Sequence, residues 1–155
     1  MPATTLHLVC GLPGAGKTTL ARRIEQDVGA VRLCPDEWIQ ALGLDLWDEA
    51  TRARVECLQW EIGKKMISLG VSVVVEWGTW GRSEREHLRD EAMAIGARVH
   101  LYILDPPLDI LLRRVHARGL EDPPITERDL DEWSRSFQRP DAEELARYDH
   151  VDWQT

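Results

Sequence analysis

The chain has 155 residues, of which 43% are hydrophobic and 30% charged, a balance typical of a globular protein with one hydrophobic core. No apolar run approaches the roughly 20 residues that a membrane-spanning helix requires, and the first residues do not resemble a secretory signal, so we expect a cytoplasmic protein without a membrane partner. The net charge of −8, from 27 acidic and 19 basic residues, argues against a long nucleic acid as partner and favours a small ligand.

The cysteine pattern excludes two further classes of protein. The chain has three cysteines, Cys10, Cys34 and Cys57. An odd number argues against a disulfide framework, and the lack of CxxC spacing argues against a structural zinc site. We predict that all three are buried as small apolar side chains in a reducing compartment.

Short β-branched runs alternate with longer segments of helical periodicity along the whole chain. The apolar run at residues 6–10 is followed at once by a glycine-rich turn, which is typical of a buried strand in a parallel sheet. Strands are predicted at residues 6–10, 31–33, 72–76, 99–104 and 149–153. Helices are predicted at residues 17–28, 37–42, 48–69, 83–95, 108–117, 126–137 and 141–147.

The segment 48–69 has the clearest amphipathic pattern. We predict that its apolar stripe faces the core; the stripe consists of Val55, Leu58, Ile62, Met66 and Leu69. Residues 119–125 are rich in glycine and proline and are predicted to form a mobile loop.

This alternation predicts an α/β fold with a mostly parallel central sheet of about five strands and helices on both faces. We expect a single domain over residues 1–155, with a short lid at approximately 114–127. Ligands of such sheets bind beyond the carboxyl ends of the strands, so the residues that follow each strand are the candidate site.

The first of these turns reads Gly-Leu-Pro-Gly-Ala-Gly-Lys-Thr over residues 11–18 and fits the P-loop motif at every position. Its glycines allow successive amides to converge on phosphate oxygens. We expect Lys17 to bridge the β- and γ-phosphates and Thr18 to bind Mg²⁺. The predicted nucleotide contacts are Gly11, Pro13, Gly14, Ala15, Gly16, Lys17, Thr18 and Thr19.

Other features narrow the class of P-loop protein. The chain has no N-K-x-D element of the kind that recognises guanine in a GTPase. A motor or AAA-type ATPase normally has more than 155 residues and an apolar strand that ends in Asp or Asp-Glu, whereas the strand at 72–76 ends in the lone carboxylate of Glu76. A small kinase remains, which requires a base beside the acceptor hydroxyl, cations over the γ-phosphate and a lid.

Beyond the P-loop with its Thr-Leu-Ala extension, the chain carries Asp36, Glu76 and an Arg114-x-x-x-Arg118-Gly segment. In these features it resembles the zeta-toxin/polynucleotide-kinase-like group of P-loop phosphotransferases, which includes antibiotic-modifying kinases. The resemblance covers essentially the whole chain and implies ATP rather than GTP as donor. It implies that Asp36 accepts the proton of the attacking hydroxyl and that Arg118, supported by Arg114, meets the γ-phosphate.

One position departs from this group. In the polynucleotide kinases an arginine three residues after the catalytic aspartate holds a 3′-phosphate, and here that position is Ile39. Recognition of a nucleotide 3′-phosphate is therefore not expected.

Each assignment has a simpler alternative. Asp36 could serve as the N-cap of the following helix, and the two arginines could complement a helix C-terminus. Glu76 could hold a Mg²⁺-bound water, hydrogen-bond the acceptor, or cap the next turn. His116 could assist the arginines or remain solvated.

Seven tryptophans are present, against one phenylalanine and two tyrosines. Trp38, Trp77 and Trp80 follow predicted strands, and we expect them to contact the acceptor, with Trp77 and Trp80 the favoured pair. Trp60 is expected to face the cleft or a partner, and about half of the tryptophans to fill the core.

Three functions remain open. The first is an ATP- and Mg²⁺-dependent kinase that acts on a hydroxyl of a nucleoside, sugar or antibiotic-like molecule. The second is a polynucleotide 5′-hydroxyl kinase, and the third is an ATP-dependent switch that acts on a protein partner. The sequence predicts no oligomeric state.

Overall fold

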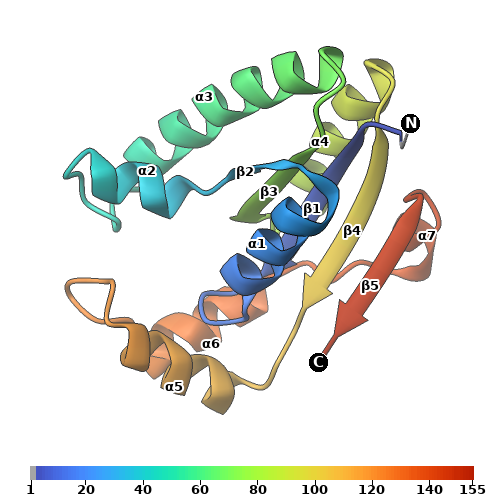
Figure 1. Cartoon of the computed structure of the whole chain (residues 1–155). Helices are drawn as coiled ribbons and strands as arrows, with labels where there is room; N and C mark the ends of the chain where they lie inside the picture. Colours follow the sequence, from blue (N-terminus) through green and yellow to red (C-terminus); the bar gives the residue numbers. More distant parts are fainter. Residues whose placement is uncertain (1–2) are drawn as a thin grey trace.

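The computed structural model describes residues 3–155 and contains one five-stranded sheet in the order β2-β3-β1-β4-β5 (Figure 1). Every neighbouring pair of strands is parallel, so the predicted α/β fold with a parallel sheet is confirmed. Met1 and Pro2 lie outside the described residues. They belong to the domain predicted over residues 1–155 and to the N-terminal segment that does not resemble a secretory signal. The elements in chain order are β1 (Thr5–Gly11), α1 (Lys17–Val28), β2 (Val31–Leu33), α2 (Pro35–Ala41), α3 (Glu49–Ser68), β3 (Val73–Gly78), α4 (Arg82–Ala94), β4 (Arg98–Leu104), α5 (Leu108–Arg118), α6 (Glu127–Ser136), α7 (Ala142–Leu145) and β5 (His150–Gln154).

The order of the strands determines where the site lies. The chain passes from β1 across β3 to β2, whereas the later connection from β3 passes across β1 to β4. The direction of winding therefore reverses between β1 and β3, and such a reversal opens a crevice at the carboxyl ends of the strands. All seven residues of β1 are buried, as are Val73, Val74 and Val75 of β3, so the two strands that flank the crevice form the centre of the core.

Helices cover both faces of the sheet, as predicted. In Figure 1, α1 lies in front of β1 and α4 lies behind the sheet. A hydrogen bond from the Trp60 indole to Glu91 joins α3 to α4, which places α3 beside α4 on the rear face. Among residues 3–155, no helix is both long and apolar enough to cross a membrane.

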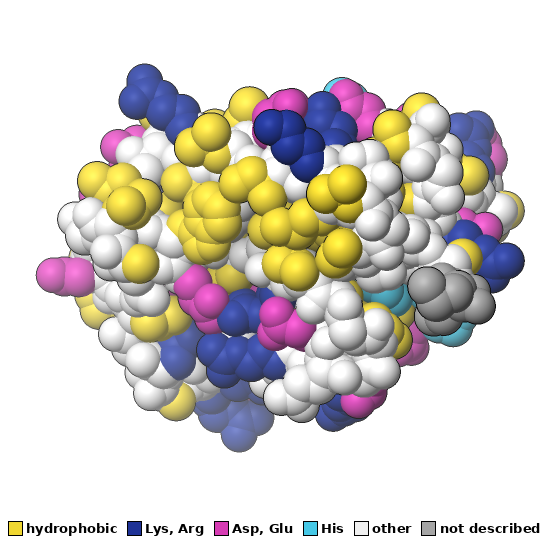
Figure 2. Space-filling model, turned by 45° about the horizontal axis from the view of Figure 1, so that its top comes forward, with side chains coloured by type: hydrophobic (Ala, Val, Ile, Leu, Met, Phe, Trp, Pro, Cys, Tyr) yellow, Lys and Arg dark blue, Asp and Glu magenta, His cyan; other side chains and the backbone are white. Residues whose placement is uncertain are grey.

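The predicted buried face of α3 is only partly correct: Val55 is buried and Met66 packs half-buried against the core, but the other three residues are exposed. Leu58, Ile62 and Leu69 are exposed by 60%, 38% and 80%, whereas the residues that α3 buries are Val55, Gln59, Trp60, Gly63 and Ile67. Gly63 decides the rotation of the helix, because a Cβ there would lie only 3.1 Å from Cδ1 of Leu33 in β2. The helix thus approaches the sheet along its glycine and turns its leucines outward. Figure 2 shows hydrophobic side chains gathered on one face of the molecule.

The prediction for the cysteines is correct for two of three. Cys10 and Cys34 are buried, but Cys57 is exposed, because it lies on the outer side of α3 next to Leu58.

The segment between α5 and α6 is held by several contacts, although a mobile loop is predicted there. Ile125 is buried, and its carbonyl oxygen lies 2.8 Å from Nε2 of His116. Thr126 and Asp129 then form a reciprocal capping box at the start of α6, as their spacing predicts. His116 is thus engaged in fixing this loop.

Candidate active site

The turn between β1 and α1 has the curled backbone that its glycines predict. Gly14 and Gly16 have φ angles of 84° and 100°, in the left-handed region that strains other residues. A Cβ at Gly14 would lie 2.8 Å from the carbonyl oxygen of Leu111, and one at Gly11 would lie 2.8 Å from that of Leu104. The loop packs so closely against β4 and α5 that glycine is required, and it leads into the N-terminus of α1, where free amides favour an anion.

Lys17 is the first residue of α1, and its ammonium lies inside this loop. Its Nζ donates hydrogen bonds of 3.0 Å to the carbonyl oxygens of both Gly11 and Leu12. Burial lowers its pKa to about 8, although the charges of Asp36 and Glu76 act in the opposite direction. An anion bound at this position would stabilise the protonated form.

The two side chains predicted to hold a metal ion are in direct contact. The hydroxyl of Thr18 donates to Oε1 of Glu76 over 2.8 Å. Oε2 of Glu76 is buried without a hydrogen bond among the described residues, 3.4 Å from Nη1 of Arg32. Hydroxyl and carboxylate oxygens are the ligands that Mg²⁺ prefers, so Thr18 and Glu76 fit such an ion or its bound water.

Asp36 lies in the first turn of α2 and lines the same cavity as the P-loop. The N-cap position is occupied by Cys34 and the helix begins at Pro35, so the alternative that Asp36 is an N-cap is wrong. Oδ1 of Asp36 lies 2.6 Å from Nη2 of Arg52 on α3. This contact orients the carboxylate at the cavity wall.

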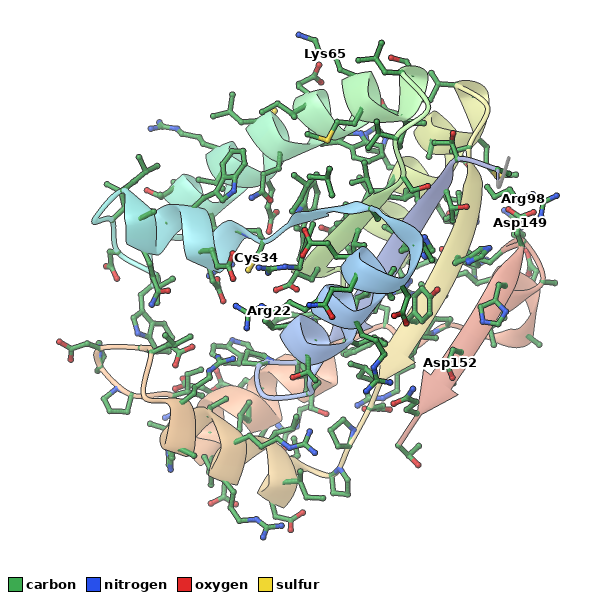
Figure 3. All side chains as sticks on the ribbon, in the orientation of Figure 1. Arg22, Cys34, Lys65, Arg98, Asp149 and Asp152 are labelled. Atoms are coloured by element: carbon green, nitrogen blue, oxygen red, sulfur yellow. The ribbon has the colours of Figure 1, made fainter. Side chains whose placement is uncertain are left out.

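The first turn of α2 is fixed against α1 and β2 by the residue after Asp36. Glu37 accepts hydrogen bonds from Nη2 of Arg32 at 2.7 Å and from Nη2 of Arg22 at 3.1 Å. Figure 3 shows Arg22 on α1 and Cys34 at the start of α2 on the same side of the molecule. These contacts set the position from which Asp36 meets the cavity.

Both predicted lid arginines line the cavity. Nη1 of Arg114 donates to the carbonyl oxygen of Gly14 over 3.2 Å, so this arginine contacts the P-loop directly. Nη2 of Arg118 donates to Glu121 over 2.6 Å, and its charge is near enough to lower the pKa of Lys17. Arg118 and Lys17 thus bring two cations to the same region.

Two of the three tryptophans predicted at the site line the cavity, and the third does not. Trp77 and Trp80 lie in its wall, with their indole nitrogens bound to Oε1 of Gln59 at 2.9 Å and to the carbonyl oxygen of Gly11 at 3.1 Å. Trp38 is absent from this wall and packs against the core with its side chain partly buried.

Trp60 is expected to face the cleft or a partner, and it lines a groove that adjoins the cavity. It is 5% exposed and meets Trp77 edge to face, with ring centroids 6.5 Å apart. Trp60 therefore supports the wall of the cavity from behind.

Sequence reasoning missed two aromatic residues of the site. Trp133 on α6 lies between Trp80 and Trp47, with ring centroids 5.9 Å from each. The indole of Trp47 donates to the carbonyl oxygen of Pro123 over 2.9 Å and so joins the segment before α3 to the loop after α5. Neither residue follows a strand, so only the abundance of tryptophan in the chain could have drawn attention to them.

Six charged residues that line the cavity were also missed: Glu49, Arg52, Glu56, Glu84, Glu121 and Asp129. Arg52 and Glu56 come from α3, and Glu84 comes from the first turn of α4. Burial raises the pKa of Glu56 to about 7, and the charge of Glu84 adds to that effect. Burial also raises the pKa of Glu84. Their sequence spacing carries no signal, because they meet only through the packing of two helices.

A buried ion pair fixes the turn after β3, which carries the tryptophan wall. Arg85 and Glu144 are both fully buried, with hydrogen bonds of 2.7 and 2.8 Å between them. The guanidinium also donates to the carbonyl oxygens of Thr79, Trp80 and Gln138 at 2.9, 3.0 and 2.6 Å. Thr79 has a positive φ of 46°, a strained conformation that these contacts hold in place.

All of these features surround one cavity of about 850 Å³, large enough for a nucleotide and a small second substrate. It brings together most of the predicted site and leaves Ala15 and Trp38 outside its wall. The predicted residues that line it are Gly11, Pro13, Gly14, Gly16, Lys17, Thr18, Thr19, Asp36, Glu76, Trp77, Trp80, Arg114 and Arg118.

The fold and the phosphate loop define the chain as a P-loop protein of the NTPase type. Residues 6–140 match the family model described as AAA domain, and the chain belongs to this family. A search of curated proteins found no match.

Several solved structures share the fold, all at low sequence identity. A chain of the Pnkp1/Rnl/Hen1 RNA repair complex has a TM-score of 0.74 at 18% identity; the alignment covers 89% of this chain but only 45% of that one. The APS kinase CysC of Mycobacterium tuberculosis, in complex with AMPPNP and APS, has a TM-score of 0.66 at 19% identity over 99% of this chain and 90% of that one. A gluconokinase from Sinorhizobium meliloti has a TM-score of 0.59 at 19% identity over 97% and 82%.

Proposed function

We propose that this protein is a kinase that transfers the γ-phosphoryl group of ATP to a hydroxyl of a small molecule. The observation that carries the proposal is that one cavity joins the P-loop, the Asp36 carboxylate and two arginines. Similarity of fold to P-loop kinases supports it, and we place the chain near the zeta-toxin/polynucleotide-kinase-like group on the motifs that it carries.

In this proposal the acceptor oxygen forms a bond to the γ-phosphorus while the bond from that phosphorus to the β–γ bridging oxygen breaks, and ADP leaves. Asp36 accepts the hydroxyl proton, and Arg52 keeps its carboxylate oriented. Lys17 and Arg118 stabilise charge on the transferred group, with Arg114 holding the loop beneath it. Mg²⁺, held by Thr18 and Glu76, would neutralise charge on the phosphates. The segment 114–127 would act as the lid.

The cavity favours a small acceptor over a polynucleotide end. Ile39, which replaces the phosphate-binding arginine of polynucleotide kinases, is fully buried and cannot meet a substrate. The chain is also strongly acidic. The RNA repair structure that shares the fold nevertheless makes an oligonucleotide with a 5′-hydroxyl a necessary member of any acceptor panel.

The test is a metabolite screen by mass spectrometry with Mg·ATP, comparing the protein with its Asp36→Asn variant. We expect a product heavier by one phosphoryl group and ADP formation that depends on the acceptor, both reduced at least 100-fold in the variant, because general-base groups typically contribute about that much. ATP hydrolysis that ignores hydroxyl compounds, responds to a protein and survives in Asp36→Asn would instead establish an ATP-dependent switch.

A further inference from the structure

Four carboxylates line the cavity without a salt bridge among residues 3–155. Glu49 is exposed and Asp129 is engaged in the capping box of α6, which leaves Glu56 and Glu84. Both of these are half-buried. The remaining carboxylates of the cavity are neutralised: Asp36 by Arg52 at 2.6 Å, Glu76 by Arg32 at 3.4 Å and Glu121 by Arg118 at 2.6 Å. Partly buried carboxylates without a counter-ion are costly unless a ligand supplies one.

These two residues act on the same region of the cavity. Both line the main cavity, Glu56 from α3 and Glu84 from the first turn of α4. Both also line an adjoining groove of about 300 Å³, so they stand where the main cavity continues between α3 and α4. A cation placed between them would relieve their mutual repulsion.

An aromatic ring forms the wall beside them. Trp77 lines both the cavity and the adjoining groove. Its indole nitrogen is bound to Gln59, which is fully buried, and Trp60 packs against its ring, so the ring is fixed in position. A fixed indole beside carboxylates is the environment that attracts an alkylammonium group, because the π face is negative.

The opposite end of the cavity has the reverse polarity. Lys17, Arg114 and Arg118 surround the P-loop there. Glu76, which also lines the cavity, has a 2% exposed side chain and an oxygen without a hydrogen bond, as expected where a bound ligand completes the contacts. The cavity thus has a basic end that suits phosphates and an acidic end that suits a positively charged group.

We infer that the acceptor is a polyhydroxyl compound with a protonated amine, such as an amino sugar or aminocyclitol, whose ammonium lies between Glu56, Glu84 and Trp77. This inference rests on the proposed function for the identity of the basic end. An acceptor with a carboxylate or phosphate would be repelled by the same residues.

The test compares acceptors that differ mainly in charge. The probes are glucosamine, N-acetylglucosamine and glucose, together with kanamycin A and its fully N-acetylated form. The rate of phosphoryl transfer from Mg·ATP to each acceptor gives kcat/KM. Tryptophan fluorescence of the Mg·ADP-loaded protein gives the affinity for each acceptor independently of turnover. The variants are Glu56→Gln and Glu84→Gln, with Glu132→Gln on the surface of α6, outside the cavity and the proposed lid, as the matched control.

We expect at least one amine to exceed its neutral counterpart by about tenfold to a hundredfold in affinity, as for hydrogen bonds to charged groups. Each cavity variant should reduce this preference at least fivefold, whereas Glu132→Gln should leave it unchanged. Preference for the amine in binding without transfer would support the inference and contradict the kinase proposal. If the neutral acceptors bind and react as well as the amines or better, the inference is overturned and the kinase proposal stands. Failure of every probe to bind would also overturn the inference.

Discussion

Lys17 has lost most of its hydration, and two carbonyl oxygens hold its ammonium where a phosphate would be expected. Replacing it with alanine removes the cation while leaving the glycine loop in place. We expect Lys17→Ala to weaken Mg·ADP binding by about 100-fold or more, roughly 3 kcal/mol, because charge-assisted hydrogen bonds to phosphate are lost. Isothermal titration calorimetry measures this change. Lys65→Ala, on the exposed side of α3, is the control, and equal affinities of the two variants would contradict the assigned role.

A row of histidines crosses three strands at matching positions, far from the proposed chemistry. His7 of β1 is in register with His100 of β4, which is in register with His150 of β5. The ring centroids of neighbours in this row lie 5.2 Å apart. Burial, together with the charges of His100 and His150, lowers the pKa of His7 to about 4. The row is therefore sensitive to acid.

This row predicts a loss of stability at low pH. Below pH 6.5 the unfolded chain protonates His7 whereas the folded protein does not until about pH 4, so the free energy of unfolding falls across this window. The loss attributable to His7 is up to about 3 kcal/mol. Urea denaturation between pH 7 and 4 measures it. His7→Phe should flatten the dependence and the exposed His87→Gln should not; a slope unchanged in His7→Phe would contradict the prediction.

At the scale of elements, the P-loop depends on how closely it packs against its neighbours. Gly14 and Gly96 both have φ near 90°, but a Cβ at Gly14 would meet Leu111 and Val115, whereas one at Gly96 would meet nothing within 4 Å. Alanine substitutions at these two glycines therefore separate the free-energy cost of a strained backbone from that of a displaced loop.

We expect Gly96→Ala to lower the free energy of unfolding by about 1 kcal/mol through backbone strain alone. Gly14→Ala should cost about 1 to 3 kcal/mol more, as overpacking does, and should weaken Mg·ADP binding as well. Chemical denaturation and calorimetry on both variants measure these effects. Similar stability and affinity in the two variants would show that the loop can move without consequence.

Periodicity and motif were sufficient to predict the elements, the parallel sheet and the phosphate loop, because each rests on neighbours in the sequence. They failed where packing between helices decides. The leucines of α3 form the more apolar stripe, yet Gly63 allows the adjacent face of the helix to approach β2, and burial follows the closest approach. The same rotation turns Glu56 into the cavity. Trp47 and Trp133 meet across more than eighty residues of chain, so no local pattern could pair them.

Across the whole molecule, the ion pair of Arg85 and Glu144 links the active-site turn to the segment before β5. Breaking a buried pair leaves one charge uncompensated. We expect Arg85→Met alone to cost about 3 to 5 kcal/mol of unfolding free energy, and Arg85→Met with Glu144→Leu to cost less than the sum of the single changes. Urea denaturation of the double-mutant cycle tests this. Should a single variant not fold, a folded double variant would still demonstrate the coupling, and strict additivity would refute it.

This pair also affects how fragments of the protein should be chosen. The family match ends at residue 140, before Glu144. A shortened protein that stops at that boundary would retain the phosphate loop, the proposed base Asp36 and the two arginines, yet the guanidinium of Arg85 would have lost the carboxylate of Glu144. Such a fragment could bind nucleotide and still fail to accept its second substrate. The family match therefore ends before the carboxylate that neutralises Arg85.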